Sequence, residues 1–84
     1  MLKVLFFARI REQLGSPGLE LEWEPALADL ASLEQRLVEQ GGAAWAETFA
    51  EPNLIRAVNQ TVVEPSAQLA DGDEVAFFPP VTGG

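Results

Sequence analysis

The spacing of the apolar residues changes at Pro25, and that change constrains the fold more than any other feature. From Leu19 to Glu24, leucine or tryptophan alternates with glutamate, which is typical of a strand with one buried face and its glutamates toward solvent. After Pro25, leucine or valine recurs at helical spacing as far as Val38, and Gly41–Gly42 provides a stop. The sequence therefore predicts one substantial helix that interrupts a series of strands.

The start of this helix has two possible positions. Pro25 suits the first helical position, because the backbone N–H that proline lacks would have no partner within the helix there. Asp29 could instead cap a shorter helix. Residues 43–50 follow the glycine pair and contain Trp45 and Phe49, which lie one helical turn apart. We expect these residues to form a short second helix that places both aromatic side chains on the core.

Four further segments are predicted to form strands: Met1–Ala8, Leu54–Asn59, Thr61–Val63 and Glu74–Phe78. Arg9–Leu14 is a polar and apolar stretch of one or two helical turns, ended by the turn residues 15–18. Pro79–Pro80 ends the last strand, because proline has no backbone N–H to donate.

The order of these elements predicts an α+β domain, and a β-grasp is its simplest closed arrangement. A mixed sheet of about five strands would be covered on one face by the main helix. The first and last strands would lie side by side and parallel in the middle of the sheet, joined by a right-handed crossover. Residues 1–80 are predicted to form this domain, and residues 81–84 a flexible functional tail.

The residue types that the chain lacks exclude most side-chain catalysis. The 84 residues include no Cys, His or Tyr, which removes disulfides, thiolate or imidazole metal sites, and the Ser-His and Cys-His nucleophile pairs. The net charge of -8 repels nucleic acid and anionic membranes and favours partners with basic surfaces. No apolar run is long enough to span a membrane and no secretory cleavage pattern is present, so the expected location is cytoplasmic.

The C-terminal residues offer the most specific chemistry. Pro79–Pro80 stiffens the exit from the last strand, and Gly83–Gly84 has no Cβ atoms, so it could enter a narrow channel and bring the α-carboxylate to a phosphate. At neutral pH this carboxylate is an anion that can attack an ATP α-phosphate. Adenylation would make it an acyl electrophile, and a sulfur nucleophile from another protein could then leave a thiocarboxylate. A Gly-Gly ending alone, however, is more commonly a loose tail.

Two pairs of adjacent phenylalanines lie in the strands predicted to be neighbours, Phe6–Phe7 in the first and Phe77–Phe78 in the last. Pleating sends the two members of each pair to opposite faces. One ring of each pair is therefore expected in the core, and the others should form an aromatic patch on the uncovered face, near the root of the tail, as a docking surface. Three arginines could rim this patch or be solvated: Arg9, Arg11 and Arg56.

The ending DGDEVAFFPPVTGG, residues 71–84, resembles the C-terminal signature of the small, sulfur-carrying subunits of molybdopterin synthase, the MoaD family. KVLFFA at residues 3–8, Arg11–Glu12 and VNQT at residues 58–61 resemble the family at matching places. The similarity thus covers both ends and the third strand, whereas residues 15–52 match only in pattern.

The resemblance implies a ubiquitin-like β-grasp fold and a non-catalytic, sulfur-donating subunit of a sulfurtransferase complex. An E1-like partner would use ATP to adenylate Gly84, and a sulfur donor protein would provide the sulfur of a Gly84 thiocarboxylate. The tail inserted in the large synthase subunit would consist of Val81, Thr82, Gly83 and Gly84. There the sulfur would pass to a cyclic pyranopterin monophosphate precursor. The chain itself would bind no cofactor or metal, and the implied assembly is a heterotetramer with two large subunits.

By position, the docking patch of the family would consist of Phe7, Val62 and Phe78, with Arg11 beside it. Val62 has a second interpretation, since a valine at the edge of a strand is also an ordinary core residue. Two other functions remain as alternatives: a sulfur carrier for thiamine or another sulfur-containing product, and a ubiquitin-like protein modifier or adaptor. The Phe-Phe-Pro-Pro-Val-Thr-Gly-Gly ending argues against the thiamine alternative.

Overall fold

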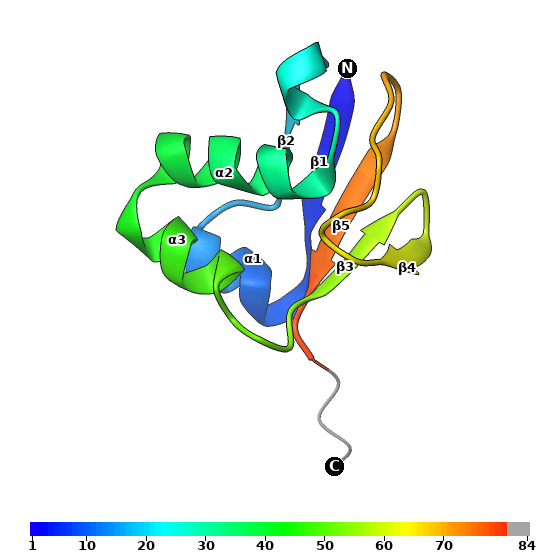
Figure 1. Ribbon diagram of the computed structural model, residues 1–84. Helices are drawn as coiled ribbons and strands as arrows, with labels where there is room; N and C mark the ends of the chain where they lie inside the picture. Colours follow the sequence, from blue (N-terminus) through cyan, green and yellow to red (C-terminus); the bar gives the residue numbers. More distant parts are fainter. Residues whose placement is uncertain (81–84) are drawn as a thin grey trace.

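The structure, a computed structural model, describes residues 1–80 and contains every strand and helix that the sequence predicts. Its elements are β1 (Leu2–Phe6), α1 (Ala8–Leu14), β2 (Gly18–Leu21), the 3-10 helix η1 (Pro25–Leu27), α2 (Leu30–Gly41), α3 (Ala43–Phe49), β3 (Ile55–Val58), β4 (Thr61–Val63) and β5 (Glu74–Phe78). The strands form one sheet, and the longest helix, α2, lies with α3 on one side of it (Figure 1).

The strand order β2-β1-β5-β3-β4 confirms the predicted β-grasp, which is of the ubiquitin-like type. β1 and β5 are parallel neighbours at the centre, in a register that sets Phe6 beside Phe77. β2 pairs antiparallel with β1, and β3 pairs antiparallel with both β5 and β4. The sheet is therefore mixed, and the end of β5 leaves it from a central position.

The face of the sheet beneath the helices is the core. The buried residues of the two central strands alternate along the sequence: Leu2, Val4 and Phe6 in β1, and Val75 and Phe77 in β5. The buried leucines of α2 pack on them: Leu30, Leu33 and Leu37. The rings of Phe6 and Phe77 lie 5.8 Å apart between centroids, and Phe49 of α3 packs edge-on to Phe77 at 4.9 Å. This confirms that one aromatic of each adjacent pair is a core residue.

Both predicted helix starts are present, one after the other. Pro25 begins the 3-10 turn η1, and Asp29 then adopts an extended conformation and caps α2. The Asp29 carboxylate accepts a hydrogen bond of 2.8 Å from the backbone N–H of Ser32. Pro25 is the first residue of the 3-10 helix and Asp29 is the cap of α2, so the two residues start different helices and the two interpretations do not compete.

The Asp29 cap is expected to weaken in acid. Hydrogen bonds from the Ser32 side chain and from its backbone N–H lower the pKa of Asp29 below its usual value of 3.8. A carboxyl with a lowered folded-state pKa stabilises the fold above its unfolded-state pKa, and this contribution is lost as the pH falls through the folded-state value. Asp29→Asn keeps an accepting oxygen but does not titrate. Thermal unfolding of both proteins should therefore show the parent losing stability relative to Asp29→Asn below about pH 4, and a constant difference would contradict the prediction.

Arg56 does not rim the uncovered face, and that part of the sequence prediction is wrong. The β3–β5 register sets Arg56 beside Phe77, so its side chain lies on the covered face. Its Nη2 donates to Glu34 of α2 at 2.9 Å, and its Nε donates to the other carboxylate oxygen. Further N–H groups donate to the carbonyls of Leu54 and Phe49. Arg56 is thus part of a buried link between α2, the end of α3 and β3.

Candidate functional site

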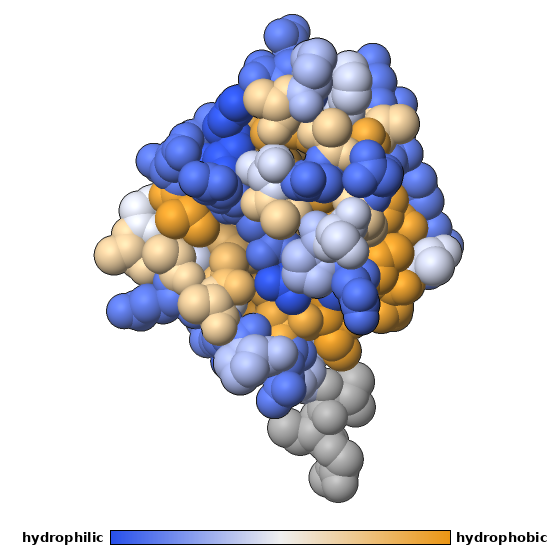
Figure 2. All heavy atoms as spheres, in the orientation of Figure 1, coloured by the Kyte–Doolittle hydropathy of each residue, from blue (hydrophilic) through white to orange (hydrophobic). Residues whose placement is uncertain are grey.

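The face of the sheet opposite the helices carries a continuous row of apolar residues. The registers of neighbouring strands place Leu5, Ala76, Ala57 and Val62 side by side across β1, β5, β3 and β4. Figure 2 shows apolar surface over the region of β3, β4 and β5 and close to the point where the described chain ends. This face is the one on which the sequence predicts a docking surface.

Phe7 and Phe78 form the aromatic part of this face. Their rings are stacked, with centroids 4.7 Å apart and an angle of 6° between planes. Phe7 is 39% exposed and Val62 is 71% exposed, which excludes the interpretation of Val62 as a core residue. The second ring of each phenylalanine pair is therefore on the uncovered face, as predicted.

The three predicted patch residues meet at one hollow of about 300 Å³. We call it the open-face hollow, and it is lined by Phe7, Ala57, Gln60, Val62, Glu74, Ala76 and Phe78. The two alanines belong to the central strands, and their small side chains leave room between the phenylalanines and Val62. Sequence reasoning missed both alanines, Gln60 and Glu74.

A sharp turn of the backbone after β1 holds Phe7 over the sheet. The Phe7 N–H donates to the Phe77 carbonyl at 3.1 Å, which continues the β1–β5 pairing by one residue. Ala8 then takes a left-handed conformation with φ 51° and starts α1. A left-handed alanine is strained by about 1–2 kcal/mol. This conformation turns the chain out of the sheet immediately after Phe7, so that the Phe7 ring remains beside Phe78.

The turn between β3 and β4 sets the opposite side of the hollow. Asn59 and Gln60 both have positive φ, as a two-residue type I′ hairpin turn requires. The Asn59 side chain donates to Asp73 at 2.9 Å and accepts from the Glu74 N–H at 3.0 Å. These bonds tie the hairpin to the start of β5. They explain the asparagine of the VNQT segment, residues 58–61. The turn that they hold in place brings Gln60 and Val62 to the hollow.

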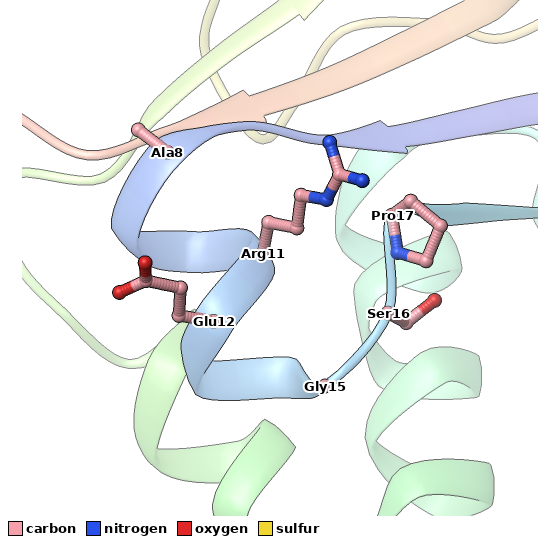
Figure 3. Close-up of a pocket in the computed structure, with 6 residues that line it drawn as sticks. All are labelled: Ala8, Arg11, Glu12, Gly15, Ser16 and Pro17. Atoms are coloured by element: carbon pink, nitrogen blue, oxygen red, sulfur yellow. The ribbon is translucent and has the colours of Figure 1, made fainter.

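Arg11 lies beside a different and more open pocket. This pocket, of about 550 Å³, is lined by Ala8, Arg11, Glu12, Gly15, Ser16 and Pro17. Figure 3 shows the Arg11 guanidinium directed toward Pro17, while Glu12 points away. The structure therefore brings Phe7, Val62 and Phe78 together at the hollow but does not bring Arg11 into it. Arg9, the remaining rim candidate, pairs with Glu51 at 3.4 Å.

The last described residues follow the stacked rings and lead toward the candidate tail. Pro79 and Pro80 are half-buried and follow Phe78 directly. The tail residues named from the sequence lie outside the described residues: Val81, Thr82, Gly83 and Gly84. Within residues 1–80, no cluster of three or more acidic side chains is placed to hold a metal ion. The helices in this same part of the chain are too short or too polar to cross a lipid bilayer.

The curated relatives agree on one group, and the solved structures with the same fold also include small archaeal modifier protein 1 of Methanosarcina acetivorans and Urm1 of Trypanosoma brucei, both at 24% identity. The chain matches the ThiS family over residues 4–84. A molybdopterin synthase sulfur carrier subunit of Escherichia coli K12 is 45% identical over 84 residues, covering the whole of both chains. A putative molybdopterin converting factor subunit 1 from Pyrococcus furiosus has a TM-score of 0.74 at 30% identity, covering 95% of this chain and 97% of that one. A chain in the Helicobacter pylori complex of subunits 1 and 2 of molybdopterin-converting factor has a TM-score of 0.64 at 24% identity, covering 99% and 97%.

Proposed function

Because this chain belongs to the ThiS family and, within it, to the molybdopterin synthase sulfur carrier subunits, we propose that it carries sulfur for molybdopterin synthesis. The observation that carries this proposal is the position of the open-face hollow. Phe78 lies in the hollow and is followed directly by the Pro-Pro-Val-Thr-Gly-Gly ending. A partner that covers the hollow would therefore also be next to the start of the tail.

We propose that the terminal carboxyl of Gly84 is the reacting group. Its carboxylate oxygen attacks the α-phosphate of ATP in an E1-like partner, and pyrophosphate leaves. A sulfur nucleophile at the oxidation level of sulfide, provided by a donor protein, then attacks the acyl carbon and displaces AMP. The product is a thiocarboxylate. The absence of Cys and His supports this chemistry, because no step requires a side-chain nucleophile from the carrier.

The partner that receives the sulfur is proposed to be the large subunit of molybdopterin synthase. The Helicobacter pylori protein was solved as a complex of subunits 1 and 2. In this chain, Phe7, Val62 and Phe78 would form the apolar contact, with Arg11 at its side, and Val81–Gly84 would enter the active site of the partner. The sulfur would pass there to a cyclic pyranopterin monophosphate precursor, in an assembly with two large subunits. A central aromatic cluster with a polar rim is the usual composition of such contacts.

The sulfur-carrying step can be tested by intact-mass analysis. Incubation with ATP, the activating enzyme and a sulfur donor is expected to replace one oxygen by sulfur, with the new atom on Gly84. A chain that lacks Gly84 is the matched control, since it retains all of residues 1–80 and should not support sulfuration of the pterin. The proposal would be wrong if the parent gained no sulfur while the shortened chain supported pterin sulfuration equally well.

A further inference from the structure

The open-face hollow has two chemically different ends. Phe78 is the last residue of β5 and Glu74 is the first, and both line the hollow. Alternate residues of one strand face the same side, so the aromatic end and the acidic end are separated along β5 by about 13 Å. The aromatic end is followed directly in the chain by Pro79 and Pro80, which lead to the tail. The acidic end is close to the Asn59–Gln60 turn, and its Gln60 is the other polar residue of the lining.

The charge of Glu74 is not balanced within residues 1–80. The ion pairs there join Arg9 to Glu51, Arg36 to Glu24, Arg56 to Glu34 and the N-terminal amine to Asp71. Lys3 of β1 is paired in register with Glu74 of β5 on one side and with Glu20 of β2 on the other. Within residues 1–80, Lys3 forms an ion pair with neither glutamate. The row Glu20–Lys3–Glu74 therefore remains net negative.

A partner that covers the hollow would remove water from a carboxylate that is already half-buried. Loss of hydration without a counter-charge is strongly unfavourable, whereas a close cation makes the same carboxylate a favourable contact. The backbone N–H and carbonyl of Glu74 form hydrogen bonds with Asn59. Its side-chain carboxylate accepts no hydrogen bond from residues 1–80. The carboxylate is therefore available to such a cation.

We infer that the large synthase subunit fills the open-face hollow with an apolar side chain and places a lysine or arginine next to it, paired with Glu74. This inference rests on the proposed function. It adds a polar contact that fixes the orientation of the partner, because an apolar hollow alone permits rotation. The aromatic end anchors the complex beside the tail, and the acidic end determines which way the partner lies. The net charge of -8 acts in the same sense by attracting a basic surface.

Glu74→Gln tests this inference. The amide retains the shape of the side chain and the backbone bonds to Asn59, so the fold should be preserved, and thermal unfolding checks this. Calorimetric titration with the large subunit is expected to show binding about 10-fold weaker than that of the parent at low salt. Glu74→Lys should bind more weakly still. The difference between Glu74→Gln and the parent should narrow at high salt, because mobile ions screen a partly exposed pair.

Glu47→Gln is the matched control, because Glu47 is exposed on α3, across the sheet from the hollow, and this variant should bind as the parent does. If the parent binds and Glu74→Gln binds equally well, the cation contact is wrong and the proposed function stands. If the parent gains sulfur at Gly84 but does not bind the large subunit at all, the proposed partner is wrong and the inference falls with it.

Discussion

A Phe78→Asp variant is expected to bind the large synthase subunit at least about 30-fold more weakly than the parent chain. Phe78 stacks on Phe7 at 4.7 Å and lines the open-face hollow, so its ring would be at the centre of the contact. Aspartate removes the stacked surface and places an unpaired charge where the partner excludes water, in a lining that already includes Glu74. The affinity can be measured by calorimetric titration.

Two further variants make this result specific. Ala43→Asp adds the same charge at an exposed site on the helical side and should leave the affinity unchanged. Val62→Asp changes a side chain that is 71% exposed, so it should weaken binding while the melting temperature stays close to that of the parent. Parent-like affinity in both Phe78→Asp and Val62→Asp would remove the open face from the interface.

The elements that the sequence predicts best are those with a chemical boundary at each end. β5 has the predicted bounds because the Asp-Gly turn precedes it and Pro79 follows it. The strand predicted to run from Leu19 to Glu24 ends at Leu21 instead. Leu21 pairs with Leu2, the first residue of β1, so the later residues have no strand beside them. Alternation of side chains indicates which residues could form a strand, but the partner strand determines where it ends.

The residues of the candidate site could be predicted where alternation along a strand assigns them to a face of the sheet. Adjacent phenylalanines must divide between two faces, and together with the predicted pairing of the first and last strands this was enough to place Phe7 and Phe78 on the same face. The same alternation links Glu74 to Phe78 and could have identified the acidic end of the hollow. Arg56 could not be placed, because its face depends on the pairing of β3 with β5, which residues far apart in the chain determine. The role of Gly84 stays a prediction, since it lies outside the described residues.

The buried pair between Arg56 and Glu34 yields the largest expected effect on stability. Their side chains are 13% and 11% exposed, and two guanidinium nitrogens donate to the two carboxylate oxygens. Arg56→Leu would leave the Glu34 carboxylate buried without a counter-charge and would remove donors from the Leu54 and Phe49 carbonyls. We expect the free energy of unfolding, measured by chemical denaturation, to fall by about 3–5 kcal/mol.

A double variant separates the value of the pair from the cost of breaking it. In Glu34→Met with Arg56→Leu, both charges are replaced by apolar side chains, so no unpaired charge remains beneath the helices. This protein should be more stable than Arg56→Leu alone, although it carries one more substitution, because residues in contact do not contribute additively. If the double variant were instead destabilised by the sum of the two single effects, the two side chains would not be energetically coupled. The pair would then be two independent contacts, and Arg56 would act mainly through the backbone carbonyls that it binds.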